Sequence, residues 1–204
     1  KPDYAVSYDD LLLQWRSFNY IFLVIFTSDQ ETRLMDILGE YADDRNADQI
    51  AYVNASEEIY SNQGNDLFFA WFNRGTSMVQ LQDYAGAALS YDQAFQIYSQ
   101  LPEKDRPWRM MWYQTGPYFA YFYSGRYQDV INLATLTIDA ASEPYLEESF
   151  YWRALAGEAD PDQEERRARE IGPECDRRGV APERDDERGQ LDEVRLPERA
   201  RLRG

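Results

Sequence analysis

Apolar residues recur every three or four positions over most of the chain, between residues 8 and 157. Short polar stretches that contain Gly, Pro, Asn or Asp interrupt this spacing. The pattern is typical of amphipathic helices joined by turns, so the chain is predicted to be mainly α-helical. The expected helices cover residues 8–16, 29–38, 45–62, 67–81, 84–101, 108–123, 127–140 and 145–157.

One segment near the N-terminus breaks the helical spacing. Residues 18–26 form a continuous β-prone apolar run, which predicts one short strand that is apolar on both faces. Ser7 can cap the helix before it, whereas Ser28 and Glu31 form a capping-box pattern for the helix after it, which Gly39 ends. No second strand is predicted nearby. The strand would therefore keep an unpaired edge or pair with an upstream domain, and we favour the upstream domain.

Two stretches, residues 71–98 and 112–138, share an arrangement of bulky and small residues around a tight turn. Seven residues of the first stretch fall at relative offsets of 0, 4, 7, 13, 16, 20 and 23: Trp71, Gly75, Met78, Tyr84, Ala87, Tyr91 and Ala94. This spacing resembles that of a tetratricopeptide repeat. Gly75 and Ala87 would let two antiparallel helices approach closely, and Ala94 would make room for the next helix. Trp71 and Tyr84 are expected to fill the gap between the helices.

The second copy is longer and less regular. Tyr127 aligns with Tyr84 at an offset of 43 residues, and Tyr118 stands where the first copy has glycine. The family's unit is about 34 residues, so the extra length must lie in a long helix and a loop. The resemblance implies a solenoid of antiparallel helix pairs over residues 42–157, in which the helix at 45–62 caps the first pair.

Pro117 lies inside the helix expected at residues 108–123. A proline in a helix interior removes a hydrogen bond and should kink the helix. Such a kink could shape a pocket beside Tyr113 and Tyr118. The alternative is simple curvature of the helix stack.

A second resemblance covers residues 1–41. Residues 7–12 and 15–20, followed by the apolar run, look like the closing segment of a papain-like bacterial cysteine peptidase domain of the bacteriocin-processing type. The resemblance implies that residues 1–41 are the remnant of an upstream peptidase-like α/β domain. The family's cysteine nucleophile, histidine base and oxyanion-hole donor precede this segment, so no catalytic residue is carried over.

The chain contains no histidine and a single cysteine, Cys175. No Cys/His or Ser/His couple can therefore operate within it, and a histidine-ligated metal site is excluded. Cys175 lies in a charged stretch without a base, so it is not a candidate nucleophile. We predict that the chain is not an enzyme, and we assign it no catalytic residue, cofactor or metal.

Charge and hydropathy narrow the choice of partners. The net charge is −16, of which residues 158–204 contribute −4 and the rest of the chain −12. A chain with this much negative charge should repel nucleic acid and anionic lipid. The longest strongly apolar run, residues 21–26, is far shorter than the roughly 20 residues that a membrane-spanning helix needs. A protein or a peptide is the expected partner.

Composition changes abruptly near Gly157. Residues 158–204 contain no aromatic residue, and 26 of these 47 positions are Asp, Glu or Arg. Such a tail cannot build a core. Two interpretations remain open: a disordered charged tail, or an out-of-frame translation of a GC-rich gene, which the other two reading frames of the coding DNA would reveal.

The tetratricopeptide resemblance also indicates a candidate peptide groove on the first helix of each pair. The residues directed toward it are Phe69, Phe72, Thr76, Trp112, Thr115, Phe119 and Tyr151. Aromatic side chains are frequent anchors for peptides. The alternative is that they pack against the next helix pair, because aromatic stripes at helical spacing usually belong to a core. Some family members hold the C-termini of chaperones with a set of carboxylate-clamp residues. Only Asn73 fits this set, so a chaperone C-terminus is not the expected partner.

These observations favour a non-catalytic helical-repeat module for protein–protein interaction, as the C-terminal part of a larger bacterial cysteine-peptidase-like protein. The alternative is an enzyme fragment whose repeats cover or dimerise an upstream papain-like peptidase domain. A homo-oligomeric structural module is a third possibility.

Overall fold

The computed structural model of the chain describes residues 5–107, 109–141 and 146–161. Within these ranges the chain forms eight α-helices joined by turns and short 3-10 segments, which confirms the prediction of a mainly α-helical protein. The helices are α1 Tyr8–Trp15, α2 Glu31–Leu38, α3 Asp44–Ser61, α4 Gly64–Gln80, α5 Tyr84–Gln100, α6 Gly116–Tyr123, α7 Tyr127–Ala140 and α8 Glu147–Ala159. Cys175 and the tail from residue 162 onward lie outside the described residues.

Local capping explains where several helices begin and end. The Ser7 side chain accepts a hydrogen bond from the Asp10 amide at 3.1 Å, and Asp83 caps α5 in the same way. Gly39 ends α2 with a φ of 55°, as the sequence indicated. The capping box predicted at Ser28 and Glu31 is shifted, because both of its residues lie one position earlier in the chain. It caps a 3-10 segment that precedes α2.

The strand predicted over residues 18–26 is wrong. Arg16–Phe18 is a 3-10 turn, Asn19 and Tyr20 have φ values of 51° and 54°, and residues 21–27 have no regular secondary structure. A strand is stable only when it is paired, and the described residues offer it no second strand. Side chains of this segment are consequently exposed, with Leu23 and Ile25 at 87% and 91%.

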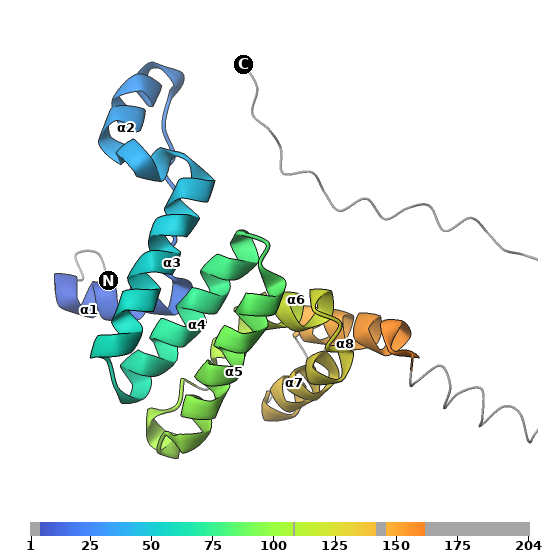
Figure 1. Cartoon of the computed structure of the whole chain (residues 1–204). Helices are drawn as coiled ribbons and strands as arrows, with labels where there is room; N and C mark the ends of the chain where they lie inside the picture. The colour runs from blue at the N-terminus through green and yellow to red at the C-terminus, as the bar shows by residue number, and fades with distance from the viewer. Residues whose placement is uncertain (1–4, 108, 142–145, 162–204) are drawn as a thin grey trace, which may run out of the picture. The chain divides into compact units, whose positions relative to one another are not determined.

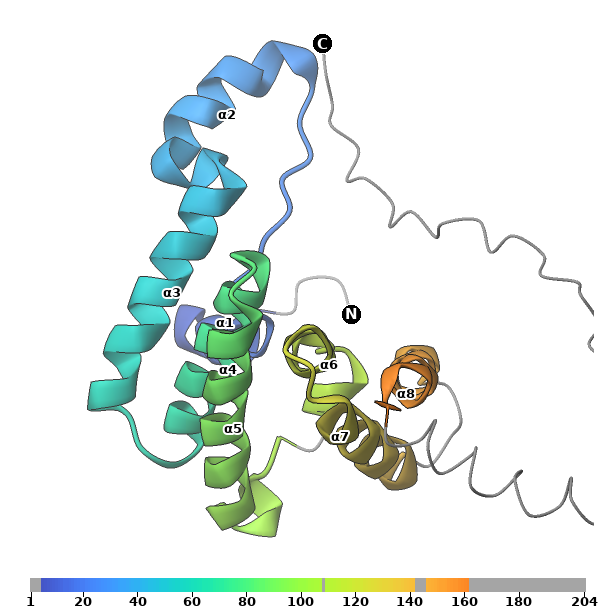
Figure 2. The same ribbon diagram turned by 45° about the vertical axis from the view of Figure 1, so that its right-hand side comes forward.

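Consecutive helices from α3 to α8 pack on one another. α4 contacts α3, α5 and α6, and Figures 1 and 2 show it between α3 and α5. Only residues 81–83 separate α4 from α5, so the two helices run antiparallel. Further contacts join α5 to α6, α6 to α7 and α7 to α8. By contrast, α1 and α2 contain no buried residue.

Tyr91 of α5 is the centre of the packing between the first helices. Its side chain is fully buried, and a Cβ added to Gly75 of α4 would lie 2.9 Å from its Cε1 atom. The sequence indicated close approach at Gly75, but it assigned the gap to Trp71 and Tyr84. Trp71 is only partly buried, and Tyr84 instead packs on Tyr123, with ring centroids 4.8 Å apart.

The predicted kink at Pro117 does not occur, because α6 begins at Gly116 and Pro117 lies in its first turn. Proline is well tolerated there, since the first amides of a helix have no partner within it. Residues 101–107 and 109–115 contain two 3-10 turns and no α-helix, where the start of this helix was predicted. The Arg106 guanidinium holds the loop to the end of α5 by donating to the carbonyls of Leu101 and Ser99, at 2.9 and 3.0 Å.

The last of the described helices, α8, packs on α6 and α7. Trp152 is 5% exposed and packs on Phe119 and Phe122 of α6, at centroid distances of 4.5 and 5.6 Å. The Tyr118 hydroxyl and Ser149 Oγ form a buried hydrogen bond of 3.0 Å between α6 and α8. No helix among the described residues has the length and apolar character that crossing a membrane requires.

Candidate functional site

Three of the predicted groove residues lie in the core. Phe69, Phe72 and Thr76 of α4 are 4%, 1% and 9% exposed. The Phe72 ring meets the Tyr91 ring edge to face at 5.0 Å, and Thr76 Oγ1 donates to the Phe72 carbonyl at 3.1 Å. For Phe72 and Thr76 the core-packing alternative describes the structure, because little of their surface is open to a ligand. Phe69 is covered in part by Arg16 of the same chain.

The other four predicted groove residues are divided between two helices and a loop. Trp112 and Thr115 are partly buried in the loop before α6, and Phe119 is partly buried against Trp152. Tyr151 of α8 is 56% exposed. The seven predicted residues therefore share no single open surface.

The outer face of α4 is covered by a segment of the same chain, residues 16–19. Asp66, Phe69, Asn73 and Ser77 are spaced three or four residues apart, so they lie on one side of α4. The Arg16 guanidinium pairs with Asp66 and stands 4.3 Å above the Phe69 ring. Asn73 Nδ2 donates to the Arg16 carbonyl at 3.0 Å, and Asn19 Nδ2 donates to Ser77 Oγ at 3.0 Å.

The loop before α6 contributes two further contacts to the same segment. Gln114 Nε2 donates to the Ser17 carbonyl at 3.1 Å. The Phe18 ring stacks on the Tyr113 ring, with centroids 5.6 Å apart and planes inclined by 23°. Residues of α4 and of the loop before α6 thus hold one short segment.

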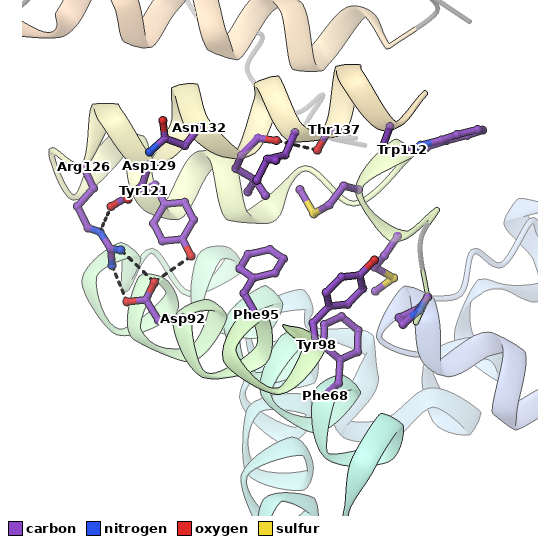
Figure 3. Close-up of a pocket in the computed structure, with 16 residues that line it drawn as sticks. Phe68, Asp92, Phe95, Tyr98, Trp112, Tyr121, Arg126, Asp129, Asn132 and Thr137 are labelled. Carbon is purple, nitrogen blue, oxygen red and sulfur yellow. Dashed lines mark hydrogen bonds and ion pairs between the residues drawn. The ribbon is translucent and has the colours of Figure 1, made fainter. Parts of the chain in front are cut away.

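A cleft of about 400 Å³ lies between α5, α7 and the loop that joins α5 to α6 (Figure 3). Its apolar wall includes residues from α4, α5, the loop and α7: Phe68, Phe95, Tyr98, Met110, Met111, Trp112, Leu133 and Leu136. Phe68 and Tyr98 both line it, with ring centroids 5.8 Å apart. The volume is within the range of about 300–1,000 Å³ that is usual for ligand pockets.

One end of the cleft is polar. Arg126 makes a two-pronged ion pair with Asp92, with Nη1–Oδ2 at 2.7 Å and Nη2–Oδ1 at 2.9 Å. Its Nε donates to Asp129 at 2.7 Å, and the Tyr121 hydroxyl donates to Asp92 at 3.0 Å (Figure 3). This network ties α5 to α6 and α7, because bidentate arginine–carboxylate pairs hold a fixed geometry.

Two groups at the polar end of the cleft, Arg126 and Tyr121, have raised pKa values. The hydrogen bonds that Arg126 donates to Asp92 raise the pKa of Arg126, and burial together with the Asp92 charge raises the pKa of Tyr121. The guanidinium therefore stays charged and the phenol stays protonated at neutral pH. Within the described ranges no group of three or more Asp, Glu, His or Cys residues is placed to hold a metal ion. The site can offer apolar surface, two carboxylates and one cation.

Sequence reasoning missed most of this cleft. Trp112 was singled out, but for a different groove, and residues 108–112 were expected to be helical. The adjacent residues Met110, Met111 and Trp112 were a usable signal, since a compact apolar cluster beside Pro107 suits a packed loop. Asn73 was named only as the single match to a carboxylate clamp; in the structure its Nδ2 donates to the Arg16 carbonyl.

Comparisons of the chain with protein-family models, with curated proteins and with solved structures find no match.

Proposed function

We propose that this chain is a non-catalytic helical-repeat module for protein–protein interaction, built as a tetratricopeptide-like solenoid. The arrangement of α4 with α5 and of α6 with α7 as consecutive helix pairs supports it, as does the close approach at Gly75. The spacing of small and bulky residues in the first pair is the sequence support.

The observation that carries this proposal is the cleft between α5 and α7. Its wall is mainly aromatic, aliphatic and thioether, which suits a bulky apolar side chain of a partner. Met110 and Met111 can adjust to the shape of that side chain, because methionine is unbranched and flexible. The cleft is therefore a site for an apolar peptide anchor.

Charge determines what should flank this anchor. The chain has a net charge of −16, and the polar end of the cleft sets Asp92 and Asp129 against the single cation of Arg126. A basic side chain beside the anchor would meet complementary charge. The proposed partner is thus a peptide with a bulky apolar residue flanked by Lys or Arg.

A displayed library of random peptides, selected on the full chain, tests this function. Peptides with an apolar anchor and basic neighbours should be enriched, and raising the salt concentration should weaken them. Leu136→Glu places a charge on the cleft wall at a side chain that is 68% exposed, so it should reduce binding by about 2 kcal/mol without lowering Tm. Leu89→Glu is the matched control, because Leu89 is 65% exposed on α5 and does not line the cleft.

Equal loss of binding in both leucine variants would show that the peptides bind elsewhere, and enrichment without any apolar anchor would refute the proposed ligand.

One observation favours the alternative function, in which the repeats cover or dimerise an upstream papain-like peptidase domain. The apolar segment of residues 21–26 is solvent-exposed throughout, and large exposed apolar patches commonly mark an interface. In the dimer version of this alternative, the mass measured by sedimentation should rise with concentration. Leu23→Asp combined with Ile25→Asp should return it to that of a monomer. A mass that does not change with concentration would remove the dimer version.

A further inference from the structure

Residues 16–19 lie on α4 in the manner of a bound peptide. The helix α1 before them has no buried residue, and residues 21–27 after them are all exposed. The contacts of the N-terminal region with the repeats are thus concentrated in this short segment. Its conformation is compact, because Trp15 Nε1 donates to the Ile21 carbonyl at 2.6 Å and closes a loop around it.

The arginine is recognised through both its charge and its flat shape. Its guanidinium pairs with Asp66 and lies over the Phe69 ring, and the side chain is only 12% exposed. Lysine could not reproduce both contacts, since it lacks a planar head that stacks on an aromatic ring. This part of the face is therefore selective for arginine.

The backbone of the segment is recognised as well. The side-chain amides of Asn73 and Gln114 donate to two consecutive carbonyls, those of Arg16 and Ser17. Side-chain amides that bind main-chain carbonyls hold a peptide whatever its side chains are. Specificity at the fourth position comes from Ser77, which accepts a hydrogen bond from the Asn19 amide.

The fit of this segment is incomplete. Among the described residues, Arg16 Nε and Asn73 Oδ1 are buried and have no hydrogen-bond partner. Buried polar atoms without partners reduce the net stability of a contact. The docked segment should consequently leave α4 more readily than a fully hydrogen-bonded segment would.

We infer that the face formed by Asp66, Phe69, Asn73 and Ser77, with Tyr113 and Gln114, is a recognition site for a peptide of the pattern Arg-x-x-Asn. The chain's own residues 16–19 occupy it, and an external peptide with this pattern binds when they are released. The surface is separate from the cleft between α5 and α7, so the inference does not depend on the proposed function of that cleft.

A labelled peptide with the sequence of residues 14–20 tests the site on the full chain. Arg16→Ala combined with Asn19→Ala should free the face while leaving its own residues unchanged. The peptide should bind this variant at least about tenfold more tightly than the wild-type chain, where the tethered segment competes at a high effective concentration. A peptide with alanine in place of its arginine should not bind.

Arg33→Ala combined with Asn54→Ala is the matched control, since both residues are exposed and remote in sequence from this face. It should bind the peptide as weakly as the wild-type chain. Equal affinity for all three proteins, or no binding to the freed face, would overturn the inference.

Cleavage by trypsin after Arg16 gives a second measurement that does not require the double variant to fold. Asp66→Asn should accelerate this cleavage by about fivefold, because it opens the docked segment more often. Asp139→Asn, an equal change of charge at an exposed position of α7, should leave the rate unchanged. The rate should also not change on dilution. Faster cleavage on dilution would mean that a second copy supplies the segment. No effect of Asp66→Asn would mean that the ion pair with Asp66 does not hold the segment on α4. Either result overturns the inference.

Discussion

At the scale of single residues, Tyr91 explains why two positions must be glycine. A Cβ on Gly75 would meet the Tyr91 ring carbons, and a Cβ on Gly116 would overlap the Tyr91 hydroxyl oxygen. The hydroxyl also lies 3.2 Å from Thr76 Oγ1 in the core. One buried side chain thus sets the spacing of α4, α5 and the start of α6.

The two glycines should respond differently to removal of that hydroxyl. Gly75→Ala and Gly116→Ala should each reduce the free energy of unfolding by about 1–3 kcal/mol through overpacking. Tyr91→Phe alone should cost about 1 kcal/mol for its lost hydrogen bond. In the Tyr91→Phe background the cost of Gly116→Ala should shrink, since the overlapping atom is gone. The cost of Gly75→Ala should stay, because its Cβ meets ring carbons at 2.9–3.0 Å.

Urea unfolding of the single and double variants measures both cycles. Identical costs of Gly116→Ala in the two backgrounds would show that the hydroxyl is not what excludes a larger residue at this position.

At the scale of elements, the helices that could be predicted are those whose signals are local. Caps at Ser7 and Gly39 and the three- and four-residue apolar spacing place most boundaries within a few residues. The strand at residues 18–26 could not be judged in this way, because a strand depends on a partner that local sequence does not contain. The start of α6 was misplaced since Pro117 fits a first turn as well as a kink.

The candidate site was less predictable than the helices. Its cleft is lined from α4, α5, α6, α7 and a loop, so no single period in the sequence marks it. Phe69 and Phe72 have the spacing of a groove stripe, yet the same spacing serves core packing, and burial decides between the two. The hydrogen bond from Asn73 to the Arg16 carbonyl could not be predicted either, because it joins residues 57 positions apart.

Helix α8 offers a test of how an element is held. Trp152 of α8 is 5% exposed between Phe119 and Phe122, whereas its neighbour Tyr151 is 56% exposed. Trp152→Ala should lower the free energy of unfolding by about 3–5 kcal/mol, and Tyr151→Ala by well under 1 kcal/mol as a surface change. Thermal unfolding followed by circular dichroism measures both. Similar losses in the two variants would mean that α8 is not packed through its tryptophan.

At the scale of the whole molecule, the two candidate surfaces meet inside α4. Phe68 lines the cleft and Phe69 lies beneath Arg16, and their rings touch edge to face at 5.1 Å. Both surfaces are therefore built on the same core, which also contains Tyr91. A variant that disturbs this core should weaken both surfaces together, whereas variants at exposed positions such as Leu136 or Asp66 should affect one.

The buried tyrosines of this core make stability depend on alkaline pH. Burial raises the pKa of Tyr91, Tyr118 and Tyr121 above the ordinary value of 10.0. The folded chain therefore keeps these protons at a pH where the unfolded chain releases them. The free energy of unfolding should be insensitive to these groups below about pH 10 and should fall as pH rises further, by up to about 1.4 kcal/mol per pH unit for each such phenol.

The Tyr91→Phe variant should show a shallower decline, although this variant is less stable than the wild-type chain at neutral pH. Urea unfolding between pH 8 and 11 measures the decline, and absorbance at 295 nm follows ionisation of the phenols. A curve that stays flat to pH 11, or full ionisation of the tyrosines before the chain unfolds, would contradict their burial.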